Sequence, residues 1–131
     1  IALDCTPALD LPTWDGSENT LYRSKLGLGP AIYLADGGTL ADPRLSALLT
    51  SVGDTYAIPY QIRQPGGGRT DASAIQHQLS GIPSISVSVP GRYLHTPASL
   101  VRLADWKNYI ALIHAALSHI DHATLQGERR L

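Results

Sequence analysis

The stretch from Gly66 to His95 constrains the fold of this chain more than any other. It opens with three glycines, continues into a short helical pattern, and then alternates isoleucine or valine with serine over residues 82–89. That period of two is typical of a β-strand with one apolar face. Because ligands of open α/β sheets bind where strands end and loops begin, we expect a functional site beyond this strand.

Helical and strand patterns alternate along the rest of the chain. We expect strands at residues 1–3, 31–34, 59–64 and 82–89, and helices at about residues 43–53, 71–80 and 104–121. This alternation predicts an α/β fold, with a mainly parallel sheet flanked by helices. The 131 residues match the usual size of one domain, so we expect a single α/β segment over residues 1–131.

Local signals predict where several of these elements begin, end and pack. Asp42 followed by Pro43 is a typical helix start, Gly81 is a helix end, and Pro90-Gly91 is expected to end the strand. The predicted core faces of the first and last helices consist of Leu45, Leu48, Leu49 and Val52, and of Trp106, Ile110, Ile113, Leu117 and Ile120.

Charge and composition exclude several classes of partner. Ten basic and eleven acidic residues give a net charge of -1, which argues against nucleic acid or an anionic membrane. Cys5 is the only cysteine, which fits a reducing compartment, and we expect a cytoplasmic protein. The chain has no methionine and begins at Ile1 inside an apolar run, so we expect it to be part of a longer protein.

The glycine run is the first candidate for chemistry. A strand, glycines and a helix start can cradle an anion with backbone N–H groups, here around Gly68, Thr70 and Asp71. The run lacks the Gly-Lys-Ser/Thr ending of a P-loop and the spacing of a dinucleotide fingerprint. A tight turn that needs positive φ angles explains the glycines equally well.

Asp4 and His95 are candidate metal ligands, because each follows a predicted strand and both are expected at one edge of the sheet. A loop aspartate and a surface histidine are the simpler interpretation. Arg92, near His95, could hold a substrate carboxylate, or it could simply be solvated. Cys5 is interpreted as a small buried apolar residue rather than a nucleophile. The histidines at positions 114, 119 and 122 are expected to be solvated.

Six segments occur in the order of a known family. They are ALDCTPA, KLGLGPAIYLADGG, IPYQ, GGGRTDASAIQ, GIPSISVSVP and GRYLH. Together they resemble the C-terminal part of the glutamyl and tetrahedral aminopeptidases, metallopeptidase family 42, some members of which are labelled endoglucanase or cellulase-like. The resemblance extends from Ile1 to about Ile120, and Gly-Arg-Thr-Asp-Ala combined with Arg-Tyr-x-His is its most specific part.

This resemblance implies an α/β zinc-peptidase fold that binds two divalent metal ions, zinc or cobalt. It implies an enzyme that removes N-terminal residues from peptides and forms homo-oligomers. Asp4 and His95 match the family's ligands, one for each metal. Thr70 and Asp71, with Gly68 before them, match an element beside the active site, and Arg92 and Tyr93 match positions near the substrate pocket.

Other parts of the family pattern are not found in this sequence. The first metal-binding histidine, the bridging aspartate, the Glu-Glu pair and the inserted β domain have no match, and the only glutamates are Glu18 and Glu128. Arg69 stands where many relatives carry glycine, which leaves subgroup and specificity open. We therefore expect the missing N-terminal part of the same enzyme to be a partner, and the isolated chain to be inactive. The alternatives are a non-catalytic interaction module and, with less support, a glycoside hydrolase using Asp4 and Asp71.

Overall fold

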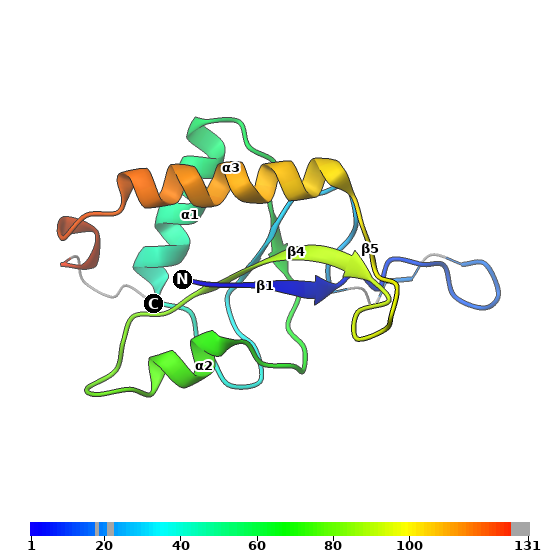
Figure 1. The fold of residues 1–131 in the computed structure, drawn as a ribbon, viewed down its shortest axis with the longest axis horizontal. Coiled ribbons are helices and arrows are strands. Elements are labelled where there is room, and N and C mark those ends of the chain that lie inside the picture. The colour runs from blue at the N-terminus through cyan, green and yellow to red at the C-terminus, as the bar shows by residue number, and fades with distance from the viewer. Residues whose placement is uncertain (18, 21–22, 127–131) are drawn as a thin grey trace.

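A mixed sheet forms the middle layer of the molecule, and helices cover both of its faces (Figure 1). The structure is a computed structural model that describes residues 1–17, 19–20 and 23–126. Helices α1 and α3 lie on one side of the sheet and α2 on the other. In chain order the elements are β1 (Ala2–Pro7), β2 (Ala31–Tyr33), α1 (Pro43–Thr55), β3 (Gln61–Arg63), α2 (Asp71–Gln76), β4 (Ser86–Arg92), β5 (Leu100–Val101), α3 (Leu103–His119) and the 3-10 helix η1 (Ala123–Leu125).

The strands follow the order β1-β4-β2-β3, and β5 pairs with the end of β4. The longest pairing, β1 with β4, is parallel, and so is β2 with β3. The pairings of β2 and β5 with β4 are antiparallel and shorter. The predicted α/β class, a sheet flanked by helices, is confirmed.

The two faces of the sheet differ in polarity, as the alternation in residues 82–89 predicts. Ile85, Val87 and Val89 are fully or almost fully buried, and they join the core cluster that β4 shares with α1 and α3. The serines point the other way. Ser86 pairs with the Thr70 hydroxyl and Ser88 donates to the Tyr33 hydroxyl, so this second face is polar.

Strand β4 begins and ends later than the sequence predicts. It runs through Pro90 and Gly91 to Arg92, so the expectation that this pair ends the strand is wrong. The carbonyls of Ile85 and Gly91 accept hydrogen bonds from Ala2 of β1 and from Ala8 just after it, so the backbone groups of odd-numbered residues in this part of the chain point toward β1. Pro90 has its backbone nitrogen on the opposite edge of β4. It lies between Ser88, which pairs with β2, and Gly91, which pairs with β5, so its missing N–H leaves no acceptor unsatisfied.

Strand β1 is also longer than predicted, and this changes the place of Asp4. The strand extends to Pro7, and Asp4 lies in its interior opposite Ser88 rather than just beyond its end. Pairing with β4 extends the strand beyond the apolar residues at its start, and the local sequence does not reveal this pairing. Among the described residues β1 pairs only with β4, and Cys5 on this edge strand is exposed, so its predicted burial is wrong.

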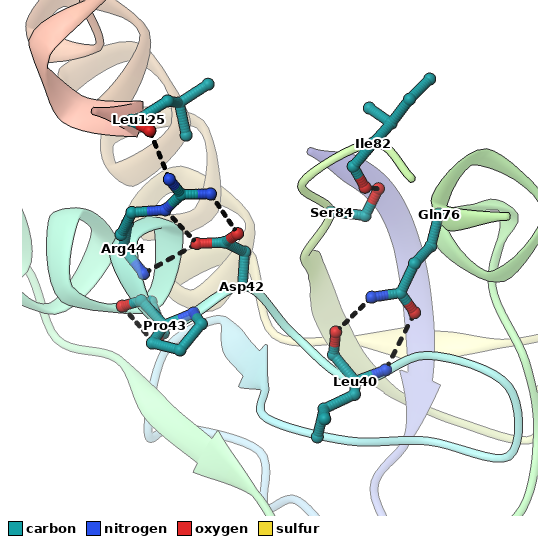
Figure 2. A network of polar contacts seen from close by, with 9 residues as sticks. Leu40, Asp42, Pro43, Arg44, Gln76, Ile82, Ser84 and Leu125 are labelled. Carbon is teal, nitrogen blue, oxygen red and sulfur yellow. Dashed lines mark hydrogen bonds and ion pairs between the residues drawn. The ribbon is translucent and has the colours of Figure 1, made fainter. Parts of the chain in front are cut away.

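The start of α1 is as predicted. The Asp42 side chain accepts the N–H of Arg44, and Pro43 occupies the first turn (Figure 2). Gln76, at the end of α2, brackets Leu40 by accepting its N–H and donating to its carbonyl, which ties α2 to the loop before α1 (Figure 2). Helix α2 ends at Gln76, so the prediction that Gly81 ends it is wrong, although Gly81 has a positive φ of 96°.

Helix α3 packs with a face that overlaps the predicted stripe only in part: Ile113 is in the core and Ile120 packs against it, as predicted. Its buried residues are Asp105, Tyr109, Leu112, Ile113 and Ala116. Trp106, Ile110 and Leu117 are exposed instead. The phase of the helix is fixed by Asp105, whose buried carboxylate accepts backbone N–H groups from residues 27 and 29. Within the described part of the chain, none of the helices combines the length and apolar character that a membrane span requires.

Candidate metal and substrate site

Asp4 and His95 line the same cleft on the polar side of the sheet. The cleft has a volume of about 250 Å³, and its described lining residues are Asp4, Cys5, Pro7, Arg23, Tyr33, Arg63, Gly67, Gly68, Arg69, Thr70, Leu94 and His95. The fold therefore brings β1, the glycine loop and the loop after β4 together. It unites the two candidate metal ligands with Gly68 and Thr70 of the predicted site.

Asp4 presents an exposed carboxylate from the edge strand. The N–H of Cys5 donates to Oδ1 of Asp4 at 2.7 Å, which restricts the orientation of the carboxylate. Partial burial raises the pKa of the Cys5 thiol, and the neighbouring negative charge of Asp4 raises it further. Cys5 is therefore held in the neutral thiol form, and it is a poor candidate for a nucleophile.

His95 reaches the cleft from a tight loop just after β4. His95 and Tyr93 both have positive φ angles, 63° and 60°, which residues other than glycine adopt rarely. The Thr96 hydroxyl donates to the carbonyl of Tyr93 at 2.6 Å and closes the turn. Such backbone strain is often found at functional loops, and His95 is one of the residues that line the cleft.

The glycine loop forms the wall of the cleft opposite these residues. Gly68 has a φ of 94°, and its carbonyl accepts the N–H of Gly37 at 2.9 Å, so the loop is held against the turn after β2. Thr70 precedes α2 but makes no side-chain cap, because its hydroxyl is paired with Ser86. Asp71, the first residue of α2, is exposed and is not among the described lining residues.

Arg92 and Tyr93 line a neighbouring cleft of about 220 Å³ instead of the one that contains Asp4. Nε of Arg92 donates to Oδ1 of Asp10 at 2.8 Å. Burial would raise the pKa of Asp10, but hydrogen bonds from Arg92 and from the backbone of Leu26 outweigh it, and the pKa is lowered. Arg92 thus has a structural ion pair close to, but outside, the central cleft.

Arg63 is the residue of this cleft that the sequence does not single out. It is 3% exposed at the end of β3, and its guanidinium lies 4.3 Å from the centre of the Tyr33 ring. Nε donates to the Thr6 hydroxyl and Nη2 to the carbonyl of Gly67. A short strand with one arginine carries no local sign of a buried cation. The small serines of β4, which leave space above the sheet, are the only hint.

The described residues supply only part of a metal site. Among the described residues, no group of three or more histidine, cysteine, aspartate or glutamate side chains is placed to hold a metal ion. A zinc site requires three or four ligands. Asp4 supplies one oxygen donor and His95 one nitrogen donor, and both are of types that zinc binds. His114, His119 and His122 are all exposed, as predicted, although His119 also contacts the Tyr56 hydroxyl.

Comparison with known proteins gives a consistent result. The family model of the M42 glutamyl aminopeptidases matches residues 1–112. A putative aminopeptidase of Acetivibrio thermocellus is 32% identical over 89% of this chain and 34% of its own length. A lysyl aminopeptidase of Pyrococcus furiosus is 32% identical over 73% of this chain and 27% of its own length.

Solved structures agree with these relatives. An aminopeptidase of the archaeon Desulfurococcus kamchatkensis matches with a TM-score of 0.88 and 33% identity, over 98% of this chain and 36% of that one. The TET1 peptidase of Pyrococcus horikoshii, described as assembling into a tetrahedron or a large octahedral shell, matches with a TM-score of 0.63 and 34% identity, over 70% of this chain and 27% of that one.

The fold is thus that of the matched part of these aminopeptidase structures. The chain belongs to the M42 glutamyl aminopeptidase family. It spans about a third of the length of the relatives it matches.

Proposed function

We propose that this chain is the C-terminal part of the catalytic domain of a metal-dependent aminopeptidase that hydrolyses N-terminal residues from peptides. One observation carries the proposal: Asp4 and His95, from distant parts of the sequence, line one cleft beside the glycine loop. Family membership supports the same activity.

In this proposal Asp4 and His95 each hold one of two divalent metal ions, zinc or cobalt. Such a pair, when bound, would supply Lewis-acid activation of a water. Asp4 is kept in position by the N–H of Cys5, and His95 by the closed turn that precedes Thr96. Gly68 and Thr70 form part of the wall that binds the peptide. Asp71, Arg92 and Tyr93 lie near this wall and contribute to substrate binding.

The catalytic base and the remaining ligands are assigned to the upstream part of the same enzyme. This chain's only glutamates, Glu18 and Glu128, lie outside the described residues. We therefore propose that residues 1–131 alone do not turn over a peptide. The partners are the upstream part, the peptide substrate and further copies of the protein, and the cytoplasmic location stays a prediction from the single cysteine.

The experiment is an assay of the complete protein with aminoacyl-anilides, before and after chelation. We expect release of the anilide that stops with chelator and returns with zinc or cobalt, and no turnover by residues 1–131 alone. Absence of release by the complete protein, or release that ignores chelation, would refute the proposal.

A non-catalytic interaction module is the second candidate, because the cleft supplies only two of the ligands that a metal site needs. This candidate predicts that the complete protein, like residues 1–131 alone, does not hydrolyse these substrates. A glycoside hydrolase gains no support, because Asp4 is the only described carboxylate that lines the cleft and Asp71 does not reach it.

A further inference from the structure

The glycine loop that borders the cleft, residues 66–69, depends on the rest of the fold for its position. Glycines fill all of it except Arg69, and most of the loop is exposed, so it has little side-chain packing of its own. Its position therefore depends on hydrogen bonds made by its backbone. The carbonyl of Gly67 accepts two such bonds at 3.0 Å, from Nη1 of Arg23 and from Nη2 of Arg63.

Arg63 links this loop to the sheet. Its side chain is buried, and the guanidinium lies 4.3 Å from the centre of the Tyr33 ring in β2. Nε donates to the hydroxyl of Thr6 at 3.1 Å, and Thr6 is fully buried in β1. The two hydrogen bonds leave different nitrogens of one planar group, so this group fixes the separation between Thr6 and Gly67. All of these partners belong to this chain, and the link needs no residue from the upstream part.

The link joins two parts of the cleft that the proposed function uses. Asp4, the proposed metal ligand, comes two residues before Thr6 in β1, and side chains two apart in a strand lie on the same face of the sheet. Gly68, next to Gly67, belongs to the wall proposed to bind the peptide. Arg63 thus sets how far this wall lies from the metal. A misplacement of about 1 Å between reacting groups can cost about a hundredfold in rate.

We propose that Arg63 is a positioning residue of the cleft: through Thr6 and Gly67 it holds the glycine loop at a fixed distance from the metal at Asp4. This inference rests on the proposed peptidase function, and in it Arg63 touches neither metal nor substrate. The role depends on the shape of the guanidinium rather than on its charge. Arg63→Lys keeps the charge, but a single ammonium nitrogen cannot stand at both of the places that Nε and Nη2 occupy.

Hydrogen exchange at the Gly37 amide reports on the loop, because this N–H donates to the carbonyl of Gly68 at 2.9 Å. The measurement uses the complete, metal-loaded protein. In Arg63→Lys the Gly37 amide should exchange about tenfold faster or more, whereas the amides that pair β1 with β4 should exchange as in wild type. Lys107→Gln removes an exposed positive charge from α3, and as the matched control it should change neither rate.

Thr6→Val is the second variant, because it removes only the acceptor of Nε and keeps the shape of the buried side chain. It should accelerate exchange at Gly37 in the same direction, and it decides the matter if Arg63→Lys does not fold. An unchanged rate at Gly37, or an equal acceleration in the sheet, would overturn the inference, because Arg63 would then not hold the loop or would serve the whole fold.

Activity supplies the second readout, with the aminoacyl-anilide that the wild-type protein cleaves fastest. Per metal-loaded protomer, kcat and kcat/KM should both fall about tenfold or more in Arg63→Lys, while the metal content stays that of wild type. Wild-type kcat in a variant with accelerated exchange at Gly37 would overturn the positioning role. If the wild-type protein cleaves no anilide, the proposed function fails, and the exchange rates still decide whether Arg63 holds the loop.

Discussion

The Oδ1 atom of Asp105 accepts the backbone N–H of Gly29 at 3.0 Å, which joins the first turn of α3 to the entry of β2. Its other oxygen accepts the N–H of Gly27 at 2.7 Å. Asp105 is 1% exposed, and its bond to Gly29 is buried, whereas its bond to Gly27 is partly buried. This clamp turns Asp105, Tyr109, Leu112 and Ala116 toward the sheet and leaves Trp106 outside.

Replacing Asp105 by asparagine should destabilise the fold by about 1–3 kcal/mol. The new amide donates where one oxygen accepted, so either the buried N–H group of Gly29 or the partly buried N–H group of Gly27 loses its partner. The free energy of unfolding, measured by urea denaturation, tests this. Lys107→Gln, on the exposed side of the same helix, should stay within about 0.5 kcal/mol of wild type, and equal losses in both variants would contradict the role of the clamp.

The clamp also explains why the face of α3 could not be predicted from its sequence. Periodicity alone favours the stripe of Trp106, Ile110, Ile113, Leu117 and Ile120, of which only Ile113 and Ile120 pack in or against the core. The choice of face is made by a charged residue, Asp105, through bonds to a loop 76 positions away in the sequence. By contrast, the start of α1 at Asp42 and Pro43 depends on neighbouring residues only, and it was predicted correctly.

Gly29→Ala should destabilise the fold strongly, by about 2 kcal/mol or more. Gly29 has a φ of 83°, and an added Cβ would lie 2.1 Å from the carbonyl oxygen of Pro59, which is backbone and cannot rotate away. Thermal and urea unfolding of the purified variant measure the loss.

Gly67→Ala is the control for this substitution. A Cβ at Gly67 meets no atom within 4 Å, so its free energy of unfolding should stay close to that of wild type. Similar losses for the two alanine variants would show that the close approach to Pro59 is not what requires glycine at position 29.

The ion pair of Asp10 with Arg92 should make the free energy of unfolding depend on pH in the acidic range. The folded pKa of Asp10 is lowered from 3.8, so its contribution is fully present above pH 3.8 and is lost as the pH falls through the folded value. Asp10→Asn should therefore cost about 1 kcal/mol at pH 7 and progressively less below pH 4. Urea unfolding of both proteins between pH 7 and pH 3 checks this, and a difference that stays constant over that range would contradict the assignment.

The central cleft could be predicted from the sequence only in part. Asp4, Gly68, Thr70 and His95 were selected from their positions after strands and glycines, and from a family resemblance. Arg63 was missed, because its burial depends on Tyr33, Thr6 and Gly67, three residues that come together only in the folded sheet. Arg92 was placed near the substrate by resemblance, whereas the ion pair with Asp10 that occupies it links residues too distant for a local pattern.

The metal content of the complete protein tests the central claim most directly. Desalted wild type, His95→Ala and His114→Ala would be compared by elemental analysis. His114 is the control because it is exposed on α3 and does not line the cleft. We expect about two zinc or cobalt ions per protomer in wild type and in His114→Ala, and about one fewer in His95→Ala. Metal content in His95→Ala equal to that of wild type would contradict the account.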